Sequence, residues 1–161
     1  MLKATALAAA LLLTLAVGSA GAQSERKPPY WASISASKAA MRTGPGRNYP
    51  MTWIYHRPDL PVKVVETYPN WRKVQDPDGA TGWMLQRLLS DTRTGLVVGT
   101  EPRPLHEAPD AGSRVRYRAE PGVVGRLSKC ANGWCQFDVG GRQGYIRQDT
   151  LRGVEPGETL D

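Results

Sequence analysis

The side chains that most often carry out catalysis or bind metal ions are scarce in this sequence. It contains two cysteines and two histidines, and His56 and His106 lie far apart without metal-ligand spacing around them. The Gly44-Pro45-Gly46 run lacks the Lys-Ser/Thr that follows a phosphate-binding loop, and proline lacks the N–H that such a loop uses. No catalytic motif of the common hydrolases or metalloproteases occurs. We therefore expect no catalytic residue, no metal site, no cofactor and no enzymatic activity.

The two cysteines predict a structural disulfide. Cys130 and Cys135 flank an Asn132-Gly133 pair, and Asn-Gly is favoured in two-residue hairpin turns because both residues tolerate positive φ. Cysteines on either side of such a turn face each other at a separation that suits a disulfide. Redox-active pairs have the closer Cys-x-x-Cys spacing, so we expect a structural bond formed in an oxidising compartment.

Aromatic rings and arginines are the side chains best suited to binding, because Trp, Tyr and Arg dominate interaction hot spots. The chain has 5 Trp, 6 Tyr and 1 Phe, and most of them precede residue 90. Arginine also binds carboxylates through two parallel N–H groups. The candidate ligand-binding residues are Arg42, Tyr49, Trp53, Tyr55, Trp71, Arg72 and Trp83.

Several of these candidates have a structural interpretation as well. Trp71 and Trp83 recur as aromatic residues in the second half of the chain, which is what shared core positions would also show. Tyr49, Trp53 and Tyr55 have no equal cluster there and are the better groove candidates. Each candidate arginine either binds an anionic group or forms a surface ion pair with a nearby carboxylate.

Charge is shared unequally between the two halves of the chain. Residues 23–90 contain 10 basic and 5 acidic residues, a net charge of +5, whereas residues 91–161 contain 10 of each. A positive field favours association with anionic polymers. We therefore expect the first half to carry a binding face and the second half mainly to support it.

The first 22 residues have the pattern of an export signal. Lys3 precedes the apolar run Ala4–Val17, and Ala20-Gly21-Ala22 forms a small-x-small cleavage site with Gln23 as the expected mature start. The run is shorter than the ~20 residues that span a bilayer, so we expect a cleaved signal and no membrane span. A periplasmic or secreted location follows, in which nucleic acid is not an expected partner.

An internal repeat organises the remaining residues. Trp71 and Trp134 lie 63 positions apart, and the pairs Gly82-Trp83 and Gly144-Tyr145 lie 62 apart. Four segments of the first copy are matched to the second: Trp71–Val74 to Trp134–Phe137, Gly82–Met84 to Gly144–Ile146, Ala40–Arg42 to Pro104–His106, and Pro61–Val64 to Gly122–Gly125. The repeat predicts two similar units, one over residues 23–90 and one over residues 91–161.

Each unit is expected to be built from short strands, since 17 Gly and 13 Pro disfavour long helices. Apolar residues alternate with polar ones in several segments, which is the period of a half-buried strand. The predicted strands of the first copy are Ala32–Ala36, Ala39–Arg42, Pro61–Glu66, Trp71–Gln75 and Thr81–Met84. Thr43–Pro50 is predicted to be a loop and Gln86–Leu88 a single 3₁₀ turn. The fold class is all-β, with two tandem, partly open β-barrels.

The motif Met41-Arg42-Thr43-Gly44-Pro45-Gly46, with Trp71-Arg72 and Gly79–Trp83, resembles the bacterial SH3-like (SH3b) domain. The run from Pro50 to Leu89 and the segments Cys130–Cys135 and Gly153–Glu158 are similar to a secreted bacterial family with tandem SH3-like domains. The resemblance implies two SH3-like barrels, and it implies binding, because other SH3b domains bind peptidoglycan or its peptide stems.

The expected protein is a non-catalytic, extracytoplasmic binding module that recognises peptidoglycan or an associated envelope component through the first unit. The alternative is an adaptor that docks a periplasmic protein through the same face or an edge strand. The positions of Tyr49, Trp53 and Tyr55 distinguish these hypotheses, because a narrow groove favours a wall ligand and a flat apolar patch favours a protein.

Overall fold

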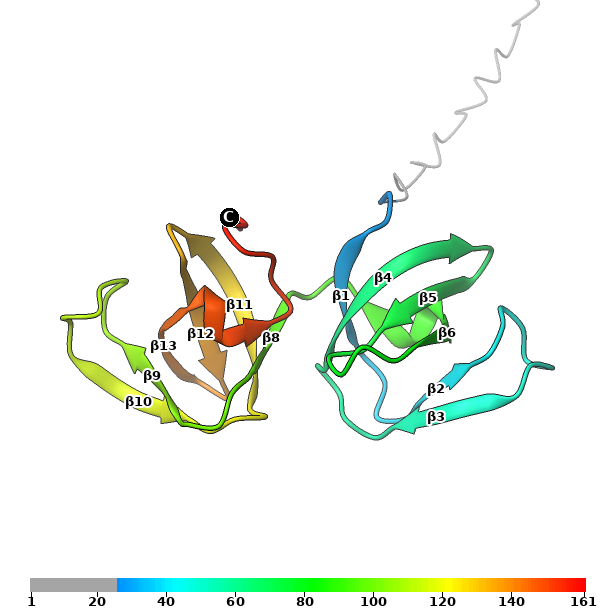
Figure 1. The fold of residues 1–161 in the computed structure, drawn as a ribbon, viewed down its shortest axis with the longest axis horizontal. Helices are drawn as coiled ribbons and strands as arrows, with labels where there is room; N and C mark the ends of the chain where they lie inside the picture. Colours follow the sequence, from blue (N-terminus) through cyan, green and yellow to red (C-terminus); the bar gives the residue numbers. More distant parts are fainter. Residues whose placement is uncertain (1–25) are drawn as a thin grey trace, which may run out of the picture.

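The computed structural model describes residues 26–161, so the predicted signal peptide and the mature start at Gln23 lie outside the described residues. These residues form two seven-stranded antiparallel sheets, one from each half of the chain, that lie side by side (Figure 1). The predicted all-β fold with two tandem SH3-like units is confirmed. We call the sheet of β1–β7 the first barrel and that of β8–β14 the second barrel.

The first barrel has the strand order β3-β2-β6-β5-β4-β1-β7. Its elements are β1 (Tyr30–Ile34), β2 (Ala39–Arg42), β3 (Met51–Tyr55), β4 (Pro61–Tyr68), β5 (Trp71–Gln75), β6 (Thr81–Leu85), η1 (Gln86–Leu88) and β7 (Leu89–Ser90). Strand β1 pairs with β4 on one side and β7 on the other, which curls the sheet around one core. Ile34, Val62, Val64, Val74 and Met84 are fully buried in this core.

The second barrel repeats this order as β10-β9-β13-β12-β11-β8-β14. Its elements are β8 (Thr94–Val97), β9 (Arg103–His106), β10 (Val115–Ala119), β11 (Val124–Ala131), β12 (Trp134–Val139), β13 (Arg142–Arg147), η2 (Gln148–Thr150) and β14 (Leu151–Arg152). Phe137 and Ile146 are fully buried at the centre of its core. Each barrel thus has a complete hydrophobic core of its own.

All five strands predicted for the first copy are present, and the 3₁₀ turn lies at Gln86–Leu88 as expected. The sequence did not predict β3, whose first three residues are exposed. This strand lies at the edge of the sheet and pairs only with β2. One-sided pairing leaves most of its side chains in solvent, so the strand lacks the apolar alternation by which half-buried strands are found.

One proposed correspondence between the copies is wrong by two residues. Val64 opposes Val74 across the β4–β5 hairpin, and Leu127 opposes Phe137 across the β11–β12 hairpin. The segment Pro61–Val64 therefore corresponds to Val124–Leu127 and not to Gly122–Gly125. The physical reason is that the tight turn between paired strands sets which residues oppose each other. Residues of the two copies therefore correspond when they lie the same number of positions before the turn.

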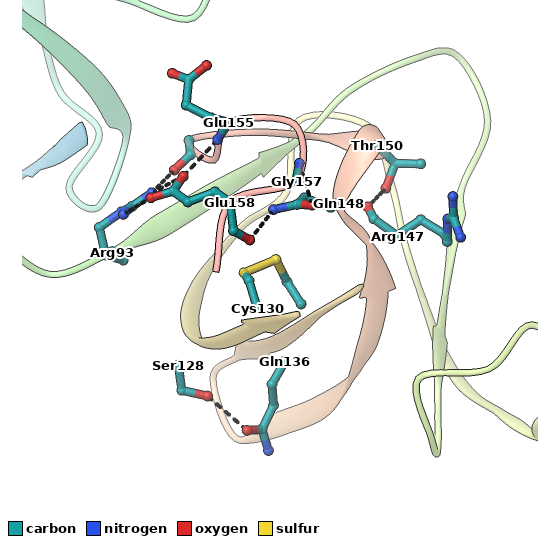
Figure 2. Close-up of a disulfide and its surroundings, with 12 residues drawn as sticks. Arg93, Ser128, Cys130, Gln136, Arg147, Gln148, Thr150, Glu155, Gly157 and Glu158 are labelled. Atoms are coloured by element: carbon teal, nitrogen blue, oxygen red, sulfur yellow. Dashed lines mark hydrogen bonds and ion pairs between the residues drawn. A yellow bond between two sulfur atoms is a disulfide. The ribbon is translucent and has the colours of Figure 1, made fainter. Parts of the chain in front are cut away.

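The β11–β12 hairpin carries the predicted disulfide. Cys130 and Cys135 are directly opposed, with their Cα atoms 4.1 Å apart and their sulfur atoms bonded. Asn132 and Gly133 both have positive φ, at 52° and 78°, as the two-residue turn requires. Figure 2 shows the bond enclosed between the hairpin and the segment that follows β14. The predicted structural disulfide is confirmed.

The two barrels contact each other directly. Leu96 and Val124 of the second barrel pack against the core residues of the first. Arg57 donates a hydrogen bond to the carbonyl oxygen of Gly122. Gly153 of the second barrel lies so close to Pro61 of the first that a Cβ atom at Gly153 would stand 3.0 Å from the Pro61 Cβ. These contacts join the two barrels beyond their covalent linker.

Candidate functional site

The loop between β2 and β3 is closed by Arg42 at the end of β2. The guanidinium Nη1 of Arg42 donates a 2.7 Å hydrogen bond to the Tyr49 carbonyl oxygen, and the Thr43 N–H donates to the Pro50 oxygen at 3.0 Å. The Tyr49 ring packs on Gly44, where a Cβ atom would lie 2.4 Å from the ring. A glycine at this position therefore lets the ring lie flat on the loop.

Beside this loop, the first barrel has a groove made of two adjoining cavities, which we call the basic groove. The larger cavity has a volume of about 710 Å³. The two cavities share Arg47, Trp71, Leu85 and Arg87 in their walls. Five cationic side chains line the groove: Lys38, Arg42, Arg47, Arg72 and Arg87. Asp91 is the single carboxylate among the described lining residues.

Arg72 is held in a fixed position within the groove wall. Its side chain is buried on β5, with 4% of the residue exposed. Its Nη1 donates to the carbonyl oxygens of Trp71 at 2.8 Å and Tyr68 at 3.2 Å, and its Nε donates to the Tyr30 hydroxyl at 3.3 Å. These bonds orient the Tyr30 ring, which also lines the groove.

Two of the predicted binding residues lie outside the groove, near the edge strand β3. Trp53 is 61% exposed and Tyr49 is 43% exposed. Met51, which is 55% exposed, lies on the same strand. Residues Met51–Ile54 line a shallow depression, so the surface around Trp53 is an open apolar face.

Two other predicted residues are buried outside the groove, Tyr55 in the core of the first barrel and Trp83 on the opposite face of the sheet. Tyr55 is 7% exposed, and its hydroxyl donates a 2.8 Å hydrogen bond to Asp76 Oδ2. Burial and the Asp76 carboxylate raise the pKa of Tyr55 well above its usual range. Trp83 is 8% exposed and meets Tyr68 edge to face, with ring centroids 6.4 Å apart. Neither ring offers much surface to a ligand.

The seven predicted residues therefore do not share one surface. The groove walls contain Arg42, Trp71 and Arg72, whereas Tyr49 and Trp53 lie near the β3 edge. Sequence reasoning missed Tyr30, Lys38, Arg47, Gln86 and Arg87, which complete the groove. A comparison of charge at matched positions of the two copies would have found the cationic members.

The groove cations have no cationic counterparts in the second barrel. Matched strand registers and 3₁₀ turns align the two barrels position by position. In the second barrel, the residues at positions 38, 42, 47, 72 and 87 are replaced by Pro102, His106, Ala111, Cys135 and Asp149. His106 is 6% exposed and its Nδ1 lies 3.0 Å from the Ser113 carbonyl oxygen. Arg93 and Arg147 of the second barrel stand at the positions of the groove residues Tyr30 and Leu85, so the groove positions carry more positive charge in the first barrel but not exclusively there.

Within residues 26–161, no group of three or more His, Cys, Asp or Glu side chains is arranged to hold a metal ion. The same part of the chain has no helix of the length and apolar character that a membrane crossing requires.

A groove on a small, curled sheet is the architecture of an SH3-like binding domain. The family model for the bacterial SH3 domain matches residues 35–91 and 100–153. The chain therefore belongs to the bacterial SH3 domain family and contains two such domains, which are binding modules. No curated protein matches the chain.

Three solved structures of longer chains match parts of this chain. NlpC2 and NlpC1 from Trichomonas vaginalis are each 13% identical, with TM-scores of 0.35, and the match covers 79% and 81% of this chain. An NlpC/P60 family protein from Bacillus cereus is 15% identical, with a TM-score of 0.35 and 76% of this chain covered. The chain spans 49%, 48% and 55% of the lengths of these proteins.

Proposed function

We propose that this protein is a non-catalytic module that binds peptidoglycan, or an envelope component associated with it, through the basic groove. The observation that carries the proposal is the charge difference between matched positions of the two barrels. Arg87 lines the groove where the second barrel has Asp149. Peptide stems present carboxylates, which arginine binds through parallel N–H groups.

Aromatic rings in the groove support the same proposal. Tyr30 and Trp71 line the larger cavity together with Arg47, Arg72 and Arg87. Sites that combine aromatic walls with a few oriented polar groups are typical of small-ligand recognition. The proposal places the protein in the periplasm or outside the cell, and it requires that residues 1–22 act as an export signal.

The test is co-sedimentation of the mature chain, beginning at Gln23, with isolated peptidoglycan sacculi across a salt series. We expect part of the binding to persist at high salt, because salt screens the charges of the groove but not contacts with its aromatic walls. The double variant Arg47→Ala/Arg87→Ala should bind at least ~10-fold more weakly, since hydrogen bonds to charged groups contribute about 1.5–3 kcal/mol each.

The matched control is Arg114→Ala/Arg142→Ala, which removes two exposed arginines from the second barrel and makes the same change in net charge. If both double variants lose binding equally, the attraction is nonspecific and the groove is not the site. If the unchanged protein fails to sediment with sacculi even at low salt, the proposal is wrong.

One observation favours the alternative of a protein-interaction adaptor. The exposed side chains of Met51 and Trp53 lie on β3, an edge strand with unpaired backbone groups, and such edges bind partner chains by strand addition. Crosslinking in cell extracts tests it, with Trp53→Ala compared to Tyr117→Ala, because Tyr117 is the matched residue of the second barrel. Loss of a crosslinked partner only in Trp53→Ala would support the adaptor.

A further inference from the structure

The segment that follows β14 binds to the second barrel as an added piece of strand. The Cys130 N–H donates to the Leu160 carbonyl oxygen at 3.1 Å, and the Leu160 N–H donates to the Cys130 oxygen at 3.0 Å. The Leu160 side chain packs against the core of the barrel. This barrel therefore holds a segment that makes a β-turn at Pro156-Gly157 and then pairs through Leu160 with the free edge of β11.

The side chain of Gln148 forms hydrogen bonds with the backbone of this segment (Figure 2). Gln148 Nε2 donates to the Glu158 carbonyl oxygen at 2.8 Å, and Gln148 Oε1 accepts a hydrogen bond from the Gly157 N–H at 3.1 Å. Arg93 holds the Glu158 carboxylate through two nitrogens, at 2.6 and 3.1 Å. With the segment in place, Gln148 is only 5% exposed.

The first barrel has the same glutamine and strand edge, but Tyr30 stands at the position of Arg93. Gln86 begins η1 as Gln148 begins η2, and the backbone N–H of each donates at 2.9 Å to the preceding hairpin turn, at Asn70 and Gly133 respectively. Gln86 is exposed and lines the basic groove. Within residues 26–161, its side chain makes no hydrogen bond, in contrast to that of Gln148.

The edge of β4 corresponds to the edge of β11. Thr67 opposes Arg72 as Cys130 opposes Cys135, one residue pair from the hairpin turn in each barrel. The Cys130 N–H and C=O point away from β12, toward Leu160. Because Thr67 has the same place in its hairpin, its N–H and C=O point away from β5. In the described part of the chain, β1 pairs with β4 only as far as Val64.

The charges near Gln86 determine what kind of segment would bind. Arg47 and Arg87 are exposed and form no ion pair with any residue of the described range. Asp91 is paired with Arg26, whose guanidinium lies 4.4 Å from the centroid of the Tyr30 ring at the rim of the groove. The net positive charge favours an acidic occupant.

We propose that the basic groove binds a peptide that bears carboxylates, in the pose that residues 155–160 adopt on the second barrel, a β-turn followed by one strand-type bridge. The Gln86 amide group donates to one peptide carbonyl and accepts a hydrogen bond from one peptide N–H. Thr67 pairs with the peptide backbone, and Arg47 or Arg87 binds a carboxylate. This inference rests on the proposed function in that it specifies the ligand class for the same groove.

The test is NMR titration of the ¹⁵N-labelled protein with a synthetic peptide that has the sequence of residues 155–161. We expect saturable shifts of the Thr67 and Gln86 signals and of the Trp71 indole. Gln86→Ala should weaken binding about 5- to 150-fold, since two neutral hydrogen bonds contribute about 0.5–1.5 kcal/mol each. Gln143→Ala, which changes an exposed glutamine of the second barrel, should bind as the unchanged protein does.

A second peptide, in which Gln and Asn replace the acidic residues, should bind at least ~5-fold more weakly because it lacks the carboxylates. Three results would overturn the inference: no saturation below about 5 mM peptide, shifts confined to the second barrel, or equal binding by Gln86→Ala and the unchanged protein. Sacculus sedimentation is scored separately. If the protein binds the peptide but not the sacculi, peptidoglycan is not its ligand, while the inference that the groove binds peptides stands. If it binds sacculi but not the peptide, only the proposed peptide pose is wrong.

Discussion

The indole Nε1 of Trp31 on β1 donates a 2.9 Å hydrogen bond to Glu155 Oε1, which lies in the segment after β14. The same carboxylate oxygen accepts from Lys63 Nζ at 2.6 Å. Trp31 and Lys63 are adjacent on the paired strands β1 and β4, so two neighbouring strands of the first barrel hold one side chain of the second. The segment that binds to the edge of the second barrel is thereby also attached to the first barrel.

This contact predicts a pH-dependent contribution to stability. The hydrogen bond from Lys63 holds the pKa of Glu155 below its usual value, and the Trp31 N–H acts in the same direction. A carboxylate with a lowered pKa in the folded state stabilises it above the unfolded pKa, and this stability is lost as the pH falls through the folded pKa.

We therefore expect Glu155→Gln to lower the melting temperature at pH 7, and the difference to shrink steadily as the pH falls below the pKa of an unfolded glutamate, about 4.3. Thermal unfolding of both proteins between pH 3 and 7 measures the difference. Glu101→Gln, at an exposed carboxylate, is the control. Equal melting temperatures for Glu155→Gln and the unchanged protein at every pH would contradict the prediction.

The disulfide should stabilise the second barrel by about 2 kcal/mol, because it closes a short loop in the unfolded chain. Cys130→Ala/Cys135→Ala is expected to lose about that free energy of unfolding, which urea denaturation measures. Reduction of the unchanged protein should produce a similar loss. An unchanged urea midpoint in both experiments would contradict the prediction. It would show that the hairpin and the added strand at Leu160 stabilise the second barrel equally well without the disulfide.

Two glycines in the last segment should differ sharply in their tolerance of alanine. Gly153 has φ +109°, and a Cβ atom there would lie 2.1 Å from the Thr94 carbonyl oxygen. Gly157 also has positive φ, at +76°, but its Cβ would meet nothing within 4 Å. Gly153→Ala should cost well over 1 kcal/mol, and Gly157→Ala about 1 kcal/mol from the backbone alone. Similar unfolding free energies for both variants would contradict this steric argument.

The Tyr55 hydroxyl should stabilise the Asp76 turn. Asp76 Oδ2 accepts from that hydroxyl, and Asp76 Oδ1 accepts from the N–H groups of Asp78 and Ala80 at 3.0 and 2.8 Å. Tyr55→Phe keeps the buried ring and removes the donor, so we expect a loss of about 1 kcal/mol in unfolding free energy. Tyr117→Phe, at an exposed ring, should have no effect.

Much of the fold could be predicted from local sequence signals. The Asn132-Gly133 turn placed Cys130 and Cys135 opposite each other, and the recurring Trp71 and Trp134 revealed the repeat. These features depend on residues close together in the chain, where turn geometry and the two-residue strand period act directly. The same local signals could not identify β3, because an edge strand has one partner and few buried side chains.

The tertiary structure decided which candidate side chains could meet a ligand. Trp53 and Tyr55 differ by two positions on one strand, yet one is 61% exposed and the other 7%, because the strand end enters the core while its middle stays at the sheet edge. Arg47 lies in the loop between β2 and β3 and Arg87 in η1, and both line the basic groove only because the sheet curls. The position of Leu160 beside Cys130 likewise depends on pairing between distant segments, for which the linear sequence contains no periodic signal.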